Sequence, residues 1–242
     1  MRILFDIGHP AHVHLFRHAI GQLTKRRHTV LLTASNKDVT VELLQHYGIP
    51  FVLLGGLGRT TISKGVQLII TGLKLALVAA LFRPDILVGV SPVRAALVAW
   101  IGRRPCVAFD DTEHADLARR LYMPFVSAVL TPSWYGGELG RVQIRYDGFH
   151  EIAYLHANYF APDATVLSEE GLTLEEPFSV VRFVSVTAAH DRNHIGFSDE
   201  GRERLVSTLS RHGRVVISSE VALPEALESY RMRGSASAVH HL

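Results

Sequence analysis

The chain has 242 residues, of which 48% are hydrophobic and 20% charged, with a formal net charge of +2. This length and composition are enough to bury a core, as one large domain or two small ones. The Lys and Arg residues are scattered rather than gathered in a stripe, so nucleic acid is excluded as the expected partner. The single cysteine, Cys106, excludes an internal disulfide framework, fits a reducing compartment and is expected in the core.

Strand-like and helix-like segments alternate along the first two thirds of the chain. The expected strands are 2–7, 28–34, 51–54, 86–90, 105–109 and 128–131. The expected helices are 12–25, 38–47, 65–82, 93–101 and 114–122. Several of the strands are continuously apolar, which is typical of parallel strands covered on both faces. The pattern predicts an α/β fold, with a doubly wound, parallel-sheet, Rossmann-like domain over residues 1–162.

A second unit is expected after a linker at residues 163–177. Residues 178–242 contain two strand-like segments, 178–186 and 214–217, and two helical ones, 198–212 and 223–231. Ser198 is the expected N-cap of the first helix. Because a two-stranded parallel sheet cannot bury both of its faces, this unit is interpreted as an incomplete second Rossmann-like domain.

One apolar segment, Gly65–Phe82, approaches the length of a membrane span. Gln67 and Lys74 lie inside it and Arg83-Pro84 closes it, so we expect a helix that is buried or docks at an interface. Peripheral contact with a membrane is kept as the alternative. The N-terminus leads directly into a strand without a leader peptide, and the expected location is therefore cytoplasmic, or peripheral at the inner face of the membrane.

Polar and titratable residues follow the expected strands at their carboxyl ends, where open α/β sheets bind ligands. Gly8 permits a tight turn, and the amide groups that open the next helix are an expected anion site. The loop lacks the G-x-G-x-x-G spacing of a dinucleotide site. The candidate site residues are Gly8, His9, His12, Ser91, Asp110, Asp111, Glu113, His114, His190, Asp191 and Glu220.

The histidines of the first helix raise the question of a metal. His14 and His18 lie one helical turn apart, but opposite the apolar stripe, so we expect an exposed pair rather than a metal site. For His12 a functional role and a capping role remain equally open. One of Asp110 and Asp111 is expected to cap the following helix while an acidic group faces the site. No metal and no cofactor is expected.

A series of blocks then resembles a known family. ILFDIGHPAHVHLFRHAI, RPDILVGVSPVRAALVA, FDDTEHA, GFHEIAYLHANYFAPD, VVRFVSVTAAHD and VVISSE occur in this order, and the series resembles the prokaryotic domain-of-unknown-function 354 family over nearly the whole chain. That family is similar to two-domain GT-B glycosyltransferases and to UDP-N-acetylglucosamine 2-epimerase. The resemblance implies a GT-B-like fold, with the acceptor bound by the first domain and the nucleotide by the second. It also implies a chain that is truncated at its C-terminus, since family members continue beyond the residues that match His240-His241.

The expected function is transfer of a sugar from a nucleotide sugar to an unknown, lipid-linked or cell-envelope acceptor, and the resemblance implies that the nucleotide is UDP. His12, Asp111 and Glu113 are the candidate bases. His190 and Asp191 are expected to face the N-terminus of the first helix, the candidate anion site, across the cleft. Three alternatives remain open: a UDP-N-acetylhexosamine 2-epimerase-like enzyme, a non-catalytic binding module or inactive fragment, and, more distantly, a metal-dependent hydrolase.

Overall fold

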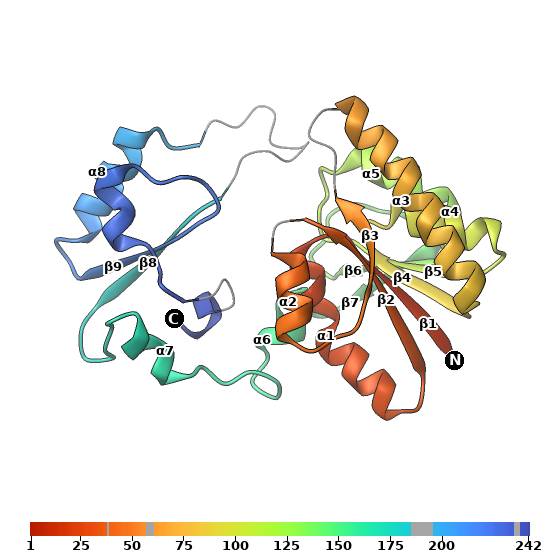
Figure 1. The fold of residues 1–242 in the computed structure, drawn as a ribbon, viewed down its shortest axis with the longest axis horizontal. Helices are drawn as coiled ribbons and strands as arrows, with labels where there is room; N and C mark the ends of the chain where they lie inside the picture. Colours follow the sequence, from red (N-terminus) through yellow and green to blue (C-terminus); the bar gives the residue numbers. More distant parts are fainter. Residues whose placement is uncertain (38, 57–60, 185–195, 235–237) are drawn as a thin grey trace. The chain divides into compact units, whose positions relative to one another are not determined.

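The structure is a computed structural model that describes residues 1–37, 39–56, 61–184, 196–234 and 238–242 (Figure 1). The chain divides into two compact units, Met1–Tyr159 and Phe160–Leu242. Each unit is described by itself.

The first unit is built on a seven-stranded sheet in the order β3-β2-β1-β4-β5-β6-β7. All of its strand pairs are parallel. The strands are β1 (Arg2–Ile7), β2 (Thr29–Asn36), β3 (Val52–Gly56), β4 (Ile86–Val90), β5 (Cys106–Phe109), β6 (Ala128–Pro132) and β7 (Gln143–Tyr146). The helices are α1 (Pro10–Lys25), α2 (Thr40–His46), α3 (Thr61–Phe82), α4 (Val93–Ile101), α5 (Asp116–Tyr122) and α6 (Ile152–Leu155). The prediction of a doubly wound parallel α/β fold is confirmed.

Two apolar layers enclose this sheet because successive strand side chains point to opposite faces. Phe5 and Ile7 of β1 pack with Phe16 of α1 on one face, together with residues of α2. Leu4 packs on the other face with residues of α3 and α4, including Leu75. Cys106 is fully buried in this second layer, as expected. Figure 1 shows α1 and α2 on one side of the sheet and α3, α4 and α5 on the other.

The expectation for the histidines of α1 was wrong for His14. Only 8% of His14 is exposed, and its ring packs against Tyr154 at 5.1 Å and Tyr47 at 5.9 Å between centroids. The cause is α6, a short helix that the sequence did not predict and that lies against α1. His18 also has an aromatic neighbour, Tyr159, at 4.9 Å.

Helix α3 was expected to be buried or to dock at an interface; it is not buried, so the first of these expectations is wrong. Residues Gly65–Phe82 form a helix long and apolar enough to cross a membrane, and only 11% of this segment is buried. Ile69, Leu73, Leu77 and Leu81 recur along one face of the helix and are 63% to 76% exposed. This face covers no other described part of the first unit.

The second unit contains one parallel pair of strands, β8 (Phe178–Phe183) and β9 (Arg214–Ser219), with helices α7 (Ala164–Glu169) and α8 (Asp199–Leu209). Ser198 caps α8 by accepting a hydrogen bond from the Gly201 amide at 3.2 Å, as expected. Leu167 and Leu172, within the expected linker 163–177, are buried against Val216 of β9.

Candidate functional site

The order of the strands reverses between β1 and β4, and the loops that follow these two strands diverge there. Such a switch point at the carboxyl edge of a parallel sheet is where α/β folds bind ligands. Gly89 in β4 permits the close pairing with β1, because a Cβ there would lie 3.0 Å from Pro92 Cβ and 3.2 Å from the Asp6 carbonyl oxygen. Ser91, directly after β4, holds a φ of 41°, a strained value for a residue with a side chain.

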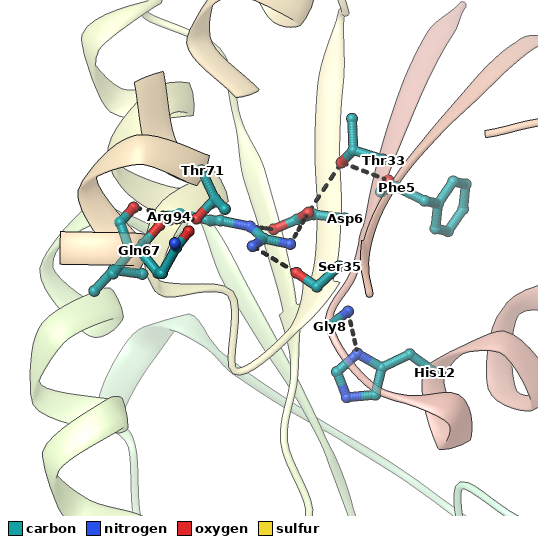
Figure 2. Close-up of polar contacts among 10 residues, drawn as sticks. Phe5, Asp6, Gly8, His12, Thr33, Ser35, Gln67, Thr71 and Arg94 are labelled. Atoms are coloured by element: carbon teal, nitrogen blue, oxygen red, sulfur yellow. Dashed lines mark hydrogen bonds and ion pairs between the residues drawn. The ribbon is translucent and has the colours of Figure 1, made fainter. Parts of the chain in front are cut away.

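A buried ion pair fixes the two sides of the switch point (Figure 2). Arg94 of α4 donates from Nε and Nη2 to the two carboxylate oxygens of Asp6 in β1, each at 2.7 Å, and from Nη1 to Ser35 Oγ at 2.8 Å. Thr33 also donates to Asp6, at 2.9 Å. Both charged side chains are less than 10% exposed. Because Asp6 lies in β1, Ser35 in β2 and Arg94 in the helix after β4, this bidentate pair orders the loops that follow the three strands.

The turn after β1 determines which nitrogen of His12 carries the proton. The Gly8 amide donates to His12 Nδ1 at 3.2 Å (Figure 2). The neutral ring then carries its proton on Nε2. His9 follows the same pattern, because its Nδ1 accepts from the Ala11 amide at 3.2 Å as the N-cap of α1. The turn therefore places the proton of each neutral ring on Nε2.

His12 stays neutral at physiological pH. Burial, followed by the electrostatic influence of His9, Lys37 and His150, lowers its pKa to about 3, while Asp111 acts in the opposite direction. These influences place His12 among residues from the carboxyl ends of four strands: β1, β2, β5 and β7.

Asp111 and His150 complete a cluster with His9, His12 and Lys37. His150 Nδ1 lies 2.8 Å from Asp111 Oδ2, and Asp111 Oδ1 accepts from Thr112 at 3.1 Å. The hydrogen bond with His150 lowers the pKa of Asp111, so the carboxylate is ionised. His150 is 8% exposed, and its ring stacks on Tyr146 with an interplanar angle of 7°.

Asp110 and Glu113 are held away from this cluster by local contacts. Asp110 is buried, where it accepts from the Tyr122 hydroxyl and, at 3.0 Å, from the Thr112 amide. Glu113 is exposed and accepts from the Gly136 amide at 2.6 Å. The expectation that an aspartate caps the next helix was wrong, because α5 has Ala115 as its N-cap, without a side-chain hydrogen bond.

The other candidate residues are dispersed. Ser91 lies at the switch point, whereas His114 lies in the exposed loop before α5. Glu220 belongs to the second unit, where it pairs with Arg182 at 2.7 Å. His190 and Asp191 lie outside the described residues. The amide groups of Ala11 and His12, expected to bind an anion, already bond to His9.

Two residues of the cluster were missed from the sequence, Lys37 and His150. Lys37 directly follows β2, so the rule that sites form after strand ends would have found it if applied to that strand. His150 follows β7, an edge strand of four residues (QIRY) that was not predicted. Among the residues that the structure describes, no group of three or more His, Cys, Asp or Glu has a metal-binding arrangement.

Sequence comparison decides the family. The sequence matches the family described as "Protein of unknown function (DUF354)" over residues 1–193. The chain belongs to this family. A comparison of the DUF354 sequence with curated proteins finds no match.

Solved structures similar to this DUF354 protein have the GT-B fold. UDP-GlcNAc 2-epimerase from Neisseria meningitidis, bound to UDP-GlcNAc, aligns with a TM-score of 0.69 at 13% identity, over 91% of this chain and 66% of that one. MurG from Acinetobacter baumannii aligns with a TM-score of 0.56 at 12% identity, over 99% and 71%. Anabaena HepE, in complex with UDP and glucose, aligns with a TM-score of 0.55 at 18% identity, over 95% and 63%. The DUF354 chain therefore spans about two thirds of the length of these enzymes, and at these identities the likeness shows the fold.

Proposed function

We propose that this DUF354 protein acts on a nucleotide sugar, UDP-linked, and transfers its sugar to an acceptor in the manner of a GT-B glycosyltransferase. The observation that carries the proposal is the group of donors at the switch point. His12 presents an Nε2–H beside His9, and the charge of Lys37 acts on the same place. Such donors suit the oxygens of a diphosphate, whose charge grows as the sugar departs.

The structural neighbours support the choice of ligand. One is bound to UDP-GlcNAc, one to UDP, and one to UDP and glucose. These ligands belong to those proteins, and we extend the nucleotide-sugar class to this chain because the donors lie where the fold binds ligands.

The first prediction concerns binding. The full chain should bind UDP-GlcNAc in isothermal titration calorimetry, and His12→Ala should weaken the affinity about tenfold or more, because a hydrogen bond to a charged group contributes about 1.5–3 kcal/mol. His212→Ala is the matched control, since His212 is exposed after α8 in the second unit. Equal affinity of the His12→Ala variant and the wild type would contradict the proposal.

A UDP-N-acetylhexosamine 2-epimerase-like reaction is the second candidate, favoured because several structural neighbours are UDP-GlcNAc 2-epimerases. Product analysis separates the two. A transferase releases UDP from UDP-GlcNAc, whereas a 2-epimerase that keeps the nucleotide attached yields a UDP-N-acetylhexosamine of inverted C2 configuration. Binding of UDP-GlcNAc without either product would favour the binding module.

We also propose that the first unit contacts a membrane from the inner, cytoplasmic side, through an apolar face. The face consists of the exposed residues of α3 and α4, which pack side by side: Val66, Ile69, Leu73, Leu77, Leu81, Leu97, Trp100 and Ile101. An exposed apolar area on two neighbouring helices marks an interaction surface. A Trp within such a face suits the boundary between headgroups and acyl chains.

The charge around this face favours an anionic lipid surface as the occupant. Residues 61–109 hold six Lys or Arg, of which Arg94 is buried against Asp6, and one acidic residue, Asp85. Arg83 follows α3, and Arg103 and Arg104 follow α4; all three are exposed. Each basic residue near an anionic membrane contributes about 1 kcal/mol, a contribution that salt screens. With this face on a membrane, the first unit would lie next to a lipid-linked acceptor.

The second prediction tests this contact by vesicle sedimentation. The full chain should sediment with vesicles of phosphatidylcholine containing phosphatidylglycerol, more than with phosphatidylcholine alone, and less at high salt. Leu73→Gln/Leu77→Gln should lose most of this binding. Leu174→Gln is the matched control, because Leu174 is 80% exposed but lies in the second unit. Equal sedimentation of the double variant, or a soluble dimer with no vesicle binding, would refute the lipid proposal.

A further inference from the structure

We propose that His150, oriented by Asp111, is the general base of this site, and that the hydroxyl group to be deprotonated lies between His150 and Tyr146. The proposal rests on the proposed function, because it assigns the proton transfer in the same reaction. It differs from the expectation that the base is His12, Asp111 or Glu113.

The contact with Asp111 determines the tautomer of His150. His150 Nδ1 lies 2.8 Å from Asp111 Oδ2, and a carboxylate accepts but does not donate. Nδ1 therefore carries a proton, and in the neutral ring Nε2 has an open lone pair. Ionised Asp111 also stabilises the imidazolium that forms when Nε2 takes up a proton, as the carboxylate of a catalytic triad does.

Nε2 of His150 is buried and has no hydrogen-bond partner within the described part of the chain. A buried polar atom without a partner costs about 1–3 kcal/mol. The ring is held by the Asp111 contact on one side and by Tyr146 and Phe109 across its faces. Because the ring is fixed and its Nε2 lone pair is unpaired, we infer that Nε2 accepts a hydrogen bond from a ligand.

Tyr146 supplies the complementary group. Its hydroxyl oxygen is also buried and unpartnered among the described residues. Burial, followed by the charges of Asp111 and Glu151, raises the pKa of Tyr146 to about 12, so the phenol keeps its proton. A ligand hydroxyl both donates and accepts. It would therefore donate to His150 Nε2 and accept from the Tyr146 hydroxyl.

The other candidate bases are less suitable. His12 accepts the Gly8 amide at Nδ1, so its Nε2 is a donor and its pKa of about 3 keeps it a weak base. Glu113 is exposed and engaged by the Gly136 amide. The ionisable groups that act around His150 are Asp111, His12 and Tyr146.

In the proposed reaction, proton transfer to His150 accompanies substitution at the anomeric carbon of the sugar. The hydroxyl proton of the acceptor moves to His150 Nε2 while the acceptor oxygen forms a bond to the anomeric carbon of the sugar. The bond from that carbon to the diphosphate oxygen breaks, and its electron pair leaves with UDP. His150 then returns the proton to UDP or to water. With water as the acceptor, the products are free sugar and UDP.

Nuclear magnetic resonance tests the tautomers without any ligand. In the full chain with ¹⁵N-labelled histidine, long-range ¹H–¹⁵N spectra should show His150 protonated at Nδ1 and unprotonated at Nε2, and His12 the reverse. His150→Gln and His12→Gln identify the two signals by their loss. A His150 ring that carries its proton on Nε2 would overturn the proposal.

Kinetics test the catalytic role, with UDP release from UDP-GlcNAc as the readout. His150→Gln should lower kcat about 10²–10⁴-fold with little change in KM, and should remove the acidic limb of the pH profile of kcat/KM. Asp111→Asn, which alters a positioning residue, should lower kcat and shift that limb. His212→Gln should match the wild type.

The outcomes separate this proposal from the proposed function. Wild-type kcat and an intact acidic limb in His150→Gln would overturn the role of His150 while nucleotide-sugar turnover stands. UDP-GlcNAc binding without UDP release by the wild type would overturn the catalytic role and leave the nucleotide-sugar ligand in place. A wild type that neither binds nor turns over UDP-GlcNAc would overturn both.

Discussion

At the scale of single residues, the site depends on backbone contacts that assign the histidines opposite tasks. His9 and His12 accept amide hydrogens at Nδ1 and present N–H groups, whereas His150 faces a carboxylate at Nδ1 and presents a lone pair. The sequence identified His9 and His12 as candidates. Residue type and spacing do not indicate which ring nitrogen accepts a hydrogen bond in the folded chain. For the same reason the roles of Asp110 and Asp111 were open until Tyr122 and His150 were placed beside them.

The neutral state of His12 should make folding sensitive to mild acid. Its folded pKa of about 3 lies below the ordinary 6.5, so between these values the unfolded chain binds a proton that the folded chain does not. The free energy of unfolding should therefore fall as pH drops below 6.5, and urea denaturation at pH 7 and pH 5 measures this. Asp111 contributes only at lower pH, since its pKa lies below 3.8.

His12→Gln should show a smaller loss of stability between pH 7 and pH 5 than the wild type, because it removes the residue that titrates. His212→Gln, which alters an exposed residue, should keep the full loss. Identical losses in the wild type and in His12→Gln would show that His12 has an ordinary pKa in the folded chain.

At the scale of elements, the sequence was most accurate where strands are continuously apolar. β1, β4 and α4 begin and end where the patterns placed them. β7 and α6 were missed because β7 has four residues, half of them exposed, and α6 is a single turn. Missing α6 also led to the wrong exposure for His14, since a helical pattern reveals the face toward the sheet but not a second covering element.

The pairing of β1 with β4 requires a glycine at position 89. Gly89→Ala should lower the free energy of unfolding by about 1–3 kcal/mol, because the added Cβ meets Pro92 and the Asp6 backbone. Urea denaturation measures the change. Gly21→Ala in α1 is the control, since its Cβ would meet nothing within 4 Å, and it should raise stability by about 0.5–1 kcal/mol. A neutral Gly89→Ala would show that the strands separate at little cost.

At the scale of the whole molecule, composition and the alternation of strand-like and helix-like segments predicted the fold class. They did not predict which helix face is exposed. The apolar composition of α3 was visible, yet a core helix and a surface-docking helix have the same composition, and only their neighbours distinguish them. Ile69, Leu73 and Leu77 are exposed because α3 packs on the core through another face, which carries Leu75, Val78, Ala79 and Phe82.

The place of β1 in the sheet has a consequence for biosynthesis. β1 is made before the other strands of its sheet, yet it lies between β2 and β4, and its partners on the β4 side are Ile86 to Gly89. On the ribosome its second edge stays unpaired until Ile86–Gly89 have been made. Because this pairing is distant in sequence, its loop-closure entropy is lost before the contact forms, which slows folding. During that interval the apolar segments of β1 and α3 are both uncovered, and we expect nascent chains of this length to be the ones that chaperones bind.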